Sequence, residues 1–441
     1  MMKNRVGFLM LLICSLIFGQ QTTFKFDFGG NRVENGFIPI TPTSKFDKKI
    51  GYGFMDVSGL QAVDRGGNSL TGDFITSNKP FYFSVAIPEG NYDITLNLGD
   101  TKGTSETTVR VENRRLMLSD VKTKQGEIVE KQISVHVKDS IIRNQNGEKI
   151  GIVKLKPRET KYLHWDNLLT IEFNDKAPKV CSVIIQPNTT AKTIYLTGDS
   201  TVVDAQYEPW ASWGQMLPYF FVLNKVVIAN YAESGETLKA FEDRHRIDKI
   251  WNRIKPGDYL FIQFGHNDQK AGNSTKSGYR KRLTAWIHKA KQLGAVPVLV
   301  TSMNRRVFDE NNKIVNTLDD FPDAMREISK EENVSLIDLN ALSKKLFEAM
   351  GPEAAKKAFV YYPANSYPNQ PNALADDTHF NPYGAYELAK CVVKSIVDQN
   401  LPLKKYVSKS YTTFDPNTPD AADKFHWPES IFMESLKPDG N

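Results

Sequence analysis

Five short runs of β-branched and aromatic residues recur through the second half of the chain, with longer stretches between them. The runs are 193–197, 226–229, 259–264, 296–301 and 334–337. The stretches 279–293, 320–331 and 384–398 carry apolar residues at helical spacing. Strands that alternate with helices form a parallel sheet covered on both faces. The pattern therefore predicts an α/β domain in this half of the chain.

The first half has a different pattern, with short strands separated by Gly, Pro and Asn and no convincing helix. The expected strands are 24–28, 81–87, 92–98, 107–111, 132–137, 168–173 and 180–185. Residues 88–91, Pro-Glu-Gly-Asn, predict a hairpin-like turn between two of these strands. Several short strands with such turns favour a β-sandwich. The polar segment 187–190 is a natural boundary between the two halves.

The chain begins with the order of features expected of a secretory signal peptide. Lys3 and Arg5 precede an apolar run over residues 6–18, and Gly19 follows. We expect cleavage after Gly19 and a secreted or periplasmic protein. Cys14 suggests a lipoprotein as an alternative, but Ile13 stands where such signals need a small residue. No other stretch is long and apolar enough to span a membrane, so we expect no membrane insertion after the signal is removed.

Charge and cysteine content exclude several classes of protein. Loss of Lys3 and Arg5 lowers the formal net charge from +5 by two. A nearly neutral chain of this size gives no reason to expect a nucleic-acid partner. Cys181 and Cys391 are the two cysteines left after processing, and they lie on segments of different domains. Because of this placement we do not expect a disulfide between them, and two cysteines cannot form a structural zinc site unaided.

Chemically capable side chains follow the ends of the expected strands. Ser200 comes directly after the first strand, in Gly198-Asp199-Ser200. A glycine permits a tight turn there, and reactive groups of α/β proteins lie at this edge of the sheet. Three further loops fall at the same edge, and they are 230–237, 265–268 and 376–379. A serine in such a place is a nucleophile only if a histidine from elsewhere reaches it.

These four loops resemble the sequence blocks of the GDSL, or SGNH, hydrolases, in the order of that family. Gly198-Asp199-Ser200 matches the serine block, Gly235 the glycine block, 265–268 the G-x-N-D block, and 376–379 the D-x-x-H block. Within that superfamily, 198–201, 265–268 and 301–306 are similar to rhamnogalacturonan acetylesterases. The resemblance implies a flavodoxin-like three-layer α/β/α domain with a parallel sheet, preceded by the all-β sandwich. Phe24, 27–29 and 88–92 make the sandwich resemble galactose-binding-like domains; an equal alternative is a sandwich that binds no sugar.

The resemblance divides the chain into four parts and assigns roles to its site residues. The parts are a signal peptide (1–19), the sandwich (20–188), the catalytic domain (189–400) and a tail packed on the surface (401–441). Ser200 would be the nucleophile, His379 its base, and Asp376 the acid that orients the imidazole. The Ser200 and Gly235 backbone N–H groups and the Asn267 side-chain amide would form the oxyanion hole.

Other assignments remain open on the sequence. Spacing alone also fits Glu242 with His245, within an expected helix, and Asp423 with His426. Only His379 would lie in a loop near the end of the sheet. Asp377 could replace Asp376 as the orienting acid.

Several polar residues near the expected site have less certain roles. Asp199 and Asp268 are expected to brace loops. His266, Arg305 and Arg306 are candidate substrate-binding residues, with a structural histidine and a solvated basic turn as the alternatives.

The sequence contains no cofactor motif, so we expect neither a cofactor nor a metal. The leading hypothesis is a secreted esterase that removes O-acetyl groups from plant polysaccharide, namely pectic rhamnogalacturonan. The alternatives are an esterase acting on acetyl xylan, lipids or thioesters, and a non-catalytic carbohydrate-binding protein. The sequence lacks a G-x-S-x-G elbow, which disfavours an α/β-hydrolase lipase. The expected partner is an acetylated polysaccharide or oligosaccharide, and the sequence does not specify an oligomeric state.

Overall fold

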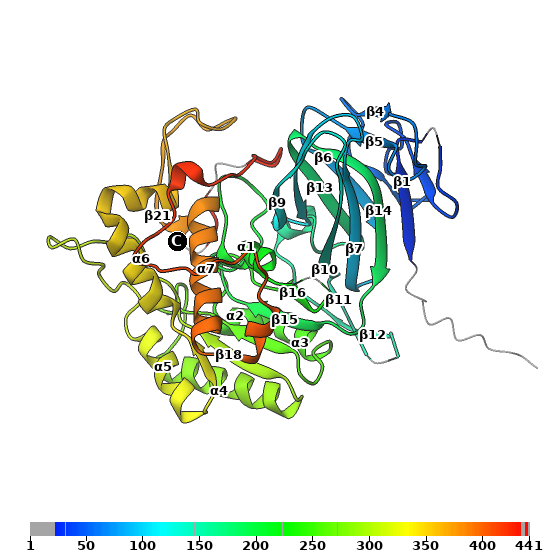
Figure 1. The fold of residues 1–441 in the computed structure, drawn as a ribbon. Coiled ribbons are helices and arrows are strands. Elements are labelled where there is room, and N and C mark those ends of the chain that lie inside the picture. Colours follow the sequence, from blue (N-terminus) through cyan, green and yellow to red (C-terminus); the bar gives the residue numbers. More distant parts are fainter. Residues whose placement is uncertain are drawn as a thin grey trace, which may run out of the picture.

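The computed structural model describes residues 23–439, except 31, 145, 223, 271 and 434–436. The expected signal peptide, residues 1–19, lies outside the described residues. An all-β domain and an α/β domain lie side by side, in blue to teal and in green to orange in Figure 1. Among the residues described, no helix is both long and apolar enough to cross a membrane.

The N-terminal domain is a sandwich of two sheets. One sheet runs β10-β7-β14-β1-β2, with β5 beside β14 and β4 beside β5, and the other runs β3-β6-β13-β8-β9. The first sheet consists of β1 (Phe24–Phe28), β2 (Ile38–Ile40), β4 (Gln61–Asp64), β5 (Asp73–Thr76), β7 (Gly90–Gly99), β10 (Ile128–Val137) and β14 (Lys179–Pro187). The second consists of β3 (Tyr52–Phe54), β6 (Phe81–Ala86), β8 (Ser105–Val111), β9 (Arg115–Thr123) and β13 (Leu168–Ala177). A small ribbon, β11 (Ile141–Arg143) and β12 (Lys149–Ile152), precedes the short helix η1 (Pro157–Lys161).

Alternation along the strands forms the sandwich core. On β7 every second side chain is buried, from Tyr92 to Leu98, and this matches the two-residue period of a strand. Aromatic rings from both sheets meet edge-on, and the Phe28 and Phe83 centroids are 5.0 Å apart. This core confirms the predicted all-β sandwich.

The predicted hairpin at residues 88–91 is wrong. The strand before it, β6, pairs with β3 and β13, whereas the strand after it, β7, pairs with β10 and β14. The turn therefore carries the chain from one sheet to the other. A polar turn between two apolar strands looks the same in sequence whether the two strands pair with each other or belong to different sheets. The pattern does not specify strand partners.

The second domain contains a five-stranded parallel sheet in the order β16-β15-β17-β18-β19. In order of sequence this is 2-1-3-4-5, the flavodoxin-like arrangement, as expected. Its strands are β15 (Lys192–Thr197), β16 (Val226–Asn230), β17 (Tyr259–Ile262), β18 (Val296–Val300) and β19 (Ser335–Ile337). A separate antiparallel pair, β20 (Phe359–Tyr362) and β21 (Leu374–Phe380), lies later in the chain.

Helices cover both faces of this sheet. One core contains side chains of α1 (Trp213–Met216), α6 (Leu339–Ala354) and α7 (Pro382–Asp398). The other contains side chains of α2 (Leu238–Asp243), α3 (Arg246–Trp251), α4 (Lys276–Gln292) and α5 (Phe321–Glu331). Short 3-10 turns add η2 (Leu217–Phe220), η3 (Ala355–Ala358), η4 (Pro402–Tyr406) and η5 (Ala422–Lys424).

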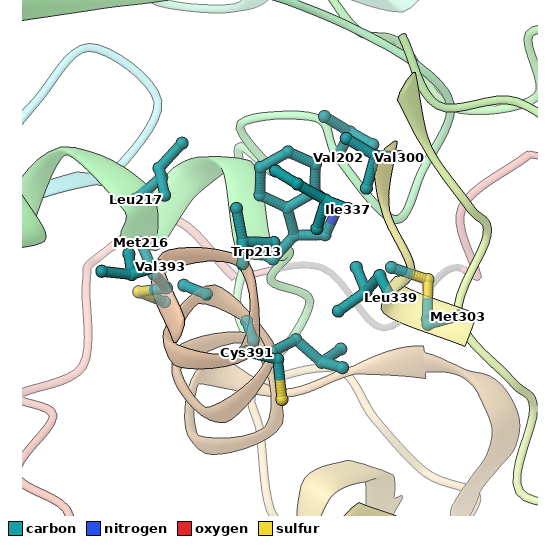
Figure 2. Close-up of a cluster of buried hydrophobic side chains, with 14 of the residues drawn as sticks. Val202, Trp213, Met216, Leu217, Val300, Met303, Ile337, Leu339, Cys391 and Val393 are labelled. Atoms are coloured by element: carbon teal, nitrogen blue, oxygen red, sulfur yellow. The ribbon is translucent and has the colours of Figure 1, made fainter. Parts of the chain in front are cut away.

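Trp213 lies at the centre of the first of these two cores. Figure 2 shows its indole among Val202, Val300 and Ile337, with Val393 of α7 nearby. The indole N–H donates to Gln263 Oε1 at 2.8 Å, and Gln263 Nε2 donates to Thr201 Oγ1 at 2.7 Å. The core is thus connected to the turn that carries Ser200.

The two domains share a buried interface. Leu116 of β9 belongs to the hydrophobic core of the α/β domain. Arg115 binds Asp204 through Nε and Nη2, at 2.9 and 2.7 Å, and Arg114 pairs with Glu208 at 2.5 Å. All four charged side chains are almost completely buried.

The C-terminal segment also crosses this interface, in red in Figure 1. The Trp427 ring lies 4.3 Å from the Arg110 guanidinium, and Ser430 Oγ lies 2.8 Å from the Tyr82 hydroxyl. Trp427 Nε1 also donates to Glu208 Oε1 of the α/β domain at 2.9 Å, so the segment packs against both domains. Cys181 and Cys391 are buried and free, as expected.

Candidate active site

The ends of three neighbouring strands meet where the strand order reverses. Ser200 follows β15, the loop 231–237 follows β16, and the loop 263–268 follows β17. Ligands of open α/β sheets bind at this reversal point. The Glu233 N–H donates to the Gly198 carbonyl at 3.2 Å and joins two of these loops.

The turn at Ser200 is built around Asp199 and Gly198. Asp199 Oδ1 accepts the Thr201 N–H at 2.9 Å and its hydroxyl at 2.7 Å. A Cβ on Gly198 would lie 2.5 Å from Val202, so the turn requires glycine. Burial raises the pKa of Asp199, but the neighbouring His266 and the hydrogen bonds from Thr201 outweigh it and lower the pKa. Asp199 therefore braces the turn as an ionised group.

His379 lies between Ser200 and Asp376. His379 Nε2 is 2.9 Å from Ser200 Oγ, and Nδ1 is 2.8 Å from Asp376 Oδ2. Asp376 Oδ1 accepts the backbone N–H groups of Thr378 and His379 at 2.8 and 3.0 Å. Burial opposes ionisation of Asp376, but the imidazole and these N–H groups hold its pKa well below the usual value. An ionised Asp376 accepts a hydrogen bond from Nδ1–H, which leaves Nε2 unprotonated and able to accept the Ser200 hydroxyl proton.

The sequence analysis placed His379 in a loop, and that is wrong. His379 belongs to β21, which pairs with β20 next to α7. The Trp210 ring meets the imidazole edge-on, with centroids 5.7 Å apart. The imidazole is therefore held by a strand and an aromatic neighbour.

The alternative acid, Asp377, faces other partners. Its Oδ1 accepts from Arg306 Nε at 2.6 Å and from the Tyr361 hydroxyl at 2.5 Å. Among the two neighbouring acids, Asp376 is the one in contact with the imidazole. The other acid–histidine pairs are also excluded: His245 pairs with Asp248, and His426 with Asp175. His245 lies between α2 and α3, at a φ of 58°, rather than within a helix.

Hydrogen-bond donors for an oxyanion are available beside Ser200. Within the described part of the chain, the backbone N–H groups of Ser200 and Gly235 donate to no other residue. Asn267 is buried; its Nδ2 donates to the Glu236 carbonyl at 3.2 Å, and its Oδ1 accepts from Lys270 Nζ at 3.2 Å. Lys270 therefore fixes which end of the amide presents its N–H groups.

Two of the three candidate substrate contacts from the sequence, Arg305 and Arg306, are engaged in hydrogen bonds within the protein. Arg305 donates to Thr378, Thr317 and the His266 carbonyl. Arg306 donates to Asp377, Tyr361 and the Pro352 carbonyl. His266 is buried, with Nδ1 3.6 Å from Asp199 Oδ2, and burial lowers its pKa despite that carboxylate. These contacts favour bracing roles for Arg305 and Arg306, whereas the ring nitrogens of His266 have no hydrogen-bond partner among the described residues.

Asp268 also braces its loop. Its Oδ1 accepts the Leu238 N–H at 3.1 Å and the Ser274 hydroxyl at 3.0 Å, and burial raises its pKa to about 7.

A pocket of about 510 Å³ opens beside these residues. Its wall is shared by η1 of the sandwich domain, the loop 205–210, Ser234 and the C-terminal residues 437–439. Lys437 Nζ lies 3.4 Å from Asp376 Oδ2, so the pocket adjoins the serine–histidine–aspartate group. No sequence motif marks the contribution of the sandwich or of Trp210 to this pocket, so neither could be predicted from the sequence.

Two groups of side chains bring possible metal ligands within 4.8 Å of one another. They are Glu159, His164 and Glu233, and Glu106, Asp120, Asp175 and His426. In the first, Arg246 and Arg158 already pair with the two carboxylates; in the second, Lys122 and His426 do so. The carboxylates of both groups are thus already in contact with Arg or Lys side chains or with His426, and we assign neither group a metal.

The fold and this residue group together define a class of protein. A serine, a histidine and an aspartate in hydrogen-bond contact, at the reversal point of a 2-1-3-4-5 sheet, are the arrangement of the SGNH-type hydrolases. Residues 196–386 match the GDSL-like lipase/acylhydrolase family, and residues 24–137 match the galactose-binding-like domain of β-agarases and YXIM-type esterases.

Curated relatives agree with this class. Rhamnogalacturonan acetylesterase RhgT of Bacillus subtilis is 44% identical over 48% of this chain and 93% of its own length. A probable rhamnogalacturonan acetylesterase of the same organism, YesY, is 34% identical over 50% of this chain and 99% of its own length. The esterase YxiM, also from B. subtilis, is 26% identical over 91% of this chain and 99% of its own. The chain belongs to the GDSL-like lipase/acylhydrolase family and is a carboxylic ester hydrolase.

Proposed function

We propose that this protein removes O-acetyl groups from plant cell-wall polysaccharide, and that its substrate is pectic rhamnogalacturonan. The observation that carries the proposal is the hydrogen-bonded group Ser200–His379–Asp376 beside free backbone N–H groups. The similarity to acetylesterases named for rhamnogalacturonan supports the choice of substrate.

The geometry supports an acyl-enzyme mechanism. His379 Nε2 takes the Ser200 proton as Oγ attacks the acetyl carbonyl, and Asp376 stabilises the imidazolium that forms. The N–H groups of Ser200 and Gly235 and the Asn267 amide meet the negative charge on the former carbonyl oxygen. Collapse breaks the ester bond, and His379 returns the proton to the sugar oxygen that leaves. Water then repeats the sequence on acetyl-Ser200, and acetate is released.

The pocket beside Ser234 is suited to an acidic saccharide. Its lining includes Lys161 and Lys437, whereas the third cation, Arg158, is already paired with Glu233 and Asp439. Guanidinium and ammonium groups bind carboxylates, which the galacturonate units of pectin carry. The rings of Tyr162 and Trp210 offer apolar surface for sugar faces.

Secretion is part of the proposal and follows from the signal-like N-terminus. N-terminal sequencing of the exported protein would test it, and we expect Gln20 as the first residue. An exported chain that still begins at Met1 would contradict it.

The direct test is acetate release by the mature protein from acetylated rhamnogalacturonan, homogalacturonan and xylan. We expect the highest kcat/KM on rhamnogalacturonan, and a loss of about 10³-fold or more in kcat for Ser200→Ala and for His379→Ala. Ser200→Ala should melt like the wild type, whereas His379→Ala should melt at a lower temperature, because it leaves the buried Asp376 carboxylate without its imidazole partner.

Three results would overturn parts of the proposal. Preference for acetyl xylan would contradict the substrate. Normal acetate release by Ser200→Ala would contradict the nucleophile, and no release by the wild type from any ester would favour a carbohydrate-binding role.

A further inference from the structure

The Ser234 carbonyl accepts hydrogen bonds from two cationic side chains of the sandwich domain. Lys156 Nζ donates to this oxygen, and Arg158 Nη2 donates to it at 3.2 Å. Both residues come from the connection between β12 and β13, which crosses onto the loop 231–237. The α/β domain thus receives part of this contact from outside its own fold.

The two cations are held in place by a buried network. Glu159, which directly follows Arg158, is fully buried and pairs with Arg246 of α3, and its Oε2 accepts the Lys156 N–H at 2.7 Å. Arg158 pairs with Glu233 at 2.5 Å, and Lys156 with Glu236 at 3.2 Å. The Lys156 side chain is only 12% exposed, so it is fixed rather than swinging in solvent.

The Ser234 carbonyl belongs to the same peptide unit as the Gly235 N–H. In a planar trans peptide the C=O and N–H point to opposite sides, so fixing one fixes the other. The positive charges of Lys156 and Arg158 beside this oxygen also polarise the peptide and make its N–H a stronger hydrogen-bond donor. The Gly235 N–H itself donates to no other described residue.

The space around Gly235 supports the same reading. Its φ is +76°, and a Cβ there would lie 3.0 Å from Asp439 and 3.3 Å from Lys156 Nζ. Gly235 therefore lies next to the Lys156 ammonium. The N–H of the Ser234–Gly235 peptide lies on the side opposite its carbonyl, where it can donate to a ligand oxygen.

We infer that Lys156, assisted by Arg158, is a positioning residue for the reaction: it orients and polarises the Ser234–Gly235 peptide whose N–H serves the oxyanion. The inference rests on the proposed function, because it needs the oxyanion role of Gly235. It gives the sandwich domain a part in the chemical step, distinct from binding polysaccharide.

The test compares Lys156→Met, which keeps the length of the side chain, with Lys156→Arg, which keeps the charge. Lys154→Met is the matched control, because Lys154 lies in the same segment with an exposed side chain. The probes are 4-nitrophenyl acetate as substrate and methylboronic acid, whose tetrahedral serine adduct carries an oxygen in the oxyanion position. Melting temperature is measured for every variant.

For Lys156→Met we expect kcat to fall about 10-fold, less than the 10²–10³-fold cost of losing a whole oxyanion donor. KM should change less than about twofold, because the interaction strengthens only in the transition state. The inhibition constant of methylboronic acid should rise in parallel with the fall in kcat. Lys156→Arg should recover most of the activity, and Lys154→Met should match the wild type.

A rise in KM at unchanged kcat would overturn the inference and make Lys156 a substrate contact. A fall in kcat with unchanged boronate inhibition, or one that follows the melting temperature, would overturn it in favour of a structural role. If Lys156→Met does not fold, Arg158→Gln carries the same test on the second donor. Failure of the proposed function is recognised separately, by a wild-type protein that shows no Ser200-dependent hydrolysis.

Discussion

Two adjacent acids near His379 have separate tasks at the residue scale. Asp376 contacts the imidazole, whereas Asp377 anchors Arg306 and Tyr361. We expect Asp376→Asn to lower kcat by about 10²–10⁴-fold, because the imidazole loses its orienting charge, and to be less damaging than Ser200→Ala.

Asp377→Asn is the matched comparison. It should lower kcat less than 10-fold and lower the melting temperature more than Asp376→Asn does, because it weakens the ion pair that joins β21 to Arg306 and the hydrogen bond from Tyr361 of β20. Steady-state kinetics and thermal melts of both variants provide the measurement. If Asp377→Asn were the more damaging to kcat, the two assignments would be exchanged.

The site residues that the sequence could supply are those within the four family blocks. Ser200, Asp376 and His379 could be named because their blocks follow strand ends in a fixed order. Trp210 and Lys156 could not, because they lie in irregular segments and reach the site only through tertiary packing. Arg305 and Arg306 show the converse: their charge suggested substrate, but the fold supplies each guanidinium with protein partners.

At the element scale, the β strands were predicted better than their partners. The strand β6 is buried on both faces, because Tyr82 on its outer side meets Ser430 and Phe432 of the C-terminal segment. Its sequence therefore lacks the alternation that would indicate which face belongs to the core. Pairing across such strands depends on the whole sandwich, so the hairpin at 88–91 could not be excluded from the sequence.

Lys138, which follows β10, makes the stability of the sandwich domain depend on pH. Its ammonium is buried, donates to the Asn230 carbonyl at the end of β16, and lies 4.6 Å from the Trp165 ring. Burial lowers the pKa of Lys138 to about 7. Between pH 7 and the ordinary lysine pKa of about 10.4, the unfolded chain binds one more proton here than the folded chain. The contribution of Lys138 to stability therefore rises with pH across that window.

Lys138→Met removes this dependence. The melting temperature of the wild type relative to Lys138→Met should rise by roughly 2 °C or more between pH 6.5 and 9.5. Lys131→Met, at a half-buried position of β10, should show no such change relative to the wild type. A constant difference between wild type and Lys138→Met would mean that the buried ammonium keeps an ordinary pKa.

At the scale of the whole molecule, the two domains do not have the interface of independent modules. Removing residues 1–189 would leave Asp204 and Glu208 without their arginine partners and would remove Leu116 from the core. Leaving one buried charge unpaired costs about 3–5 kcal/mol. We therefore expect a chain that begins at Thr190 to aggregate, or to melt well below the full chain, and to lose activity on small and polymeric esters alike.

Sedimentation, thermal melting and hydrolysis of 4-nitrophenyl acetate by the two chains provide the measurement. Arg115→Met in the full chain should reproduce part of the loss in melting temperature. A monomeric shortened chain with normal melting and normal turnover would contradict the expectation. It would mean that the α/β domain folds independently of the sandwich.

The contact between Arg115 and Asp204 also has an evolutionary consequence. Two buried charges that bind each other across a domain boundary cannot change one at a time without a large loss of stability. Among relatives that carry both domains, the two positions should therefore vary together. A sandwich taken from a distant relative should fit this hydrolase only if its arginines, and the acids they meet, are transferred as a set.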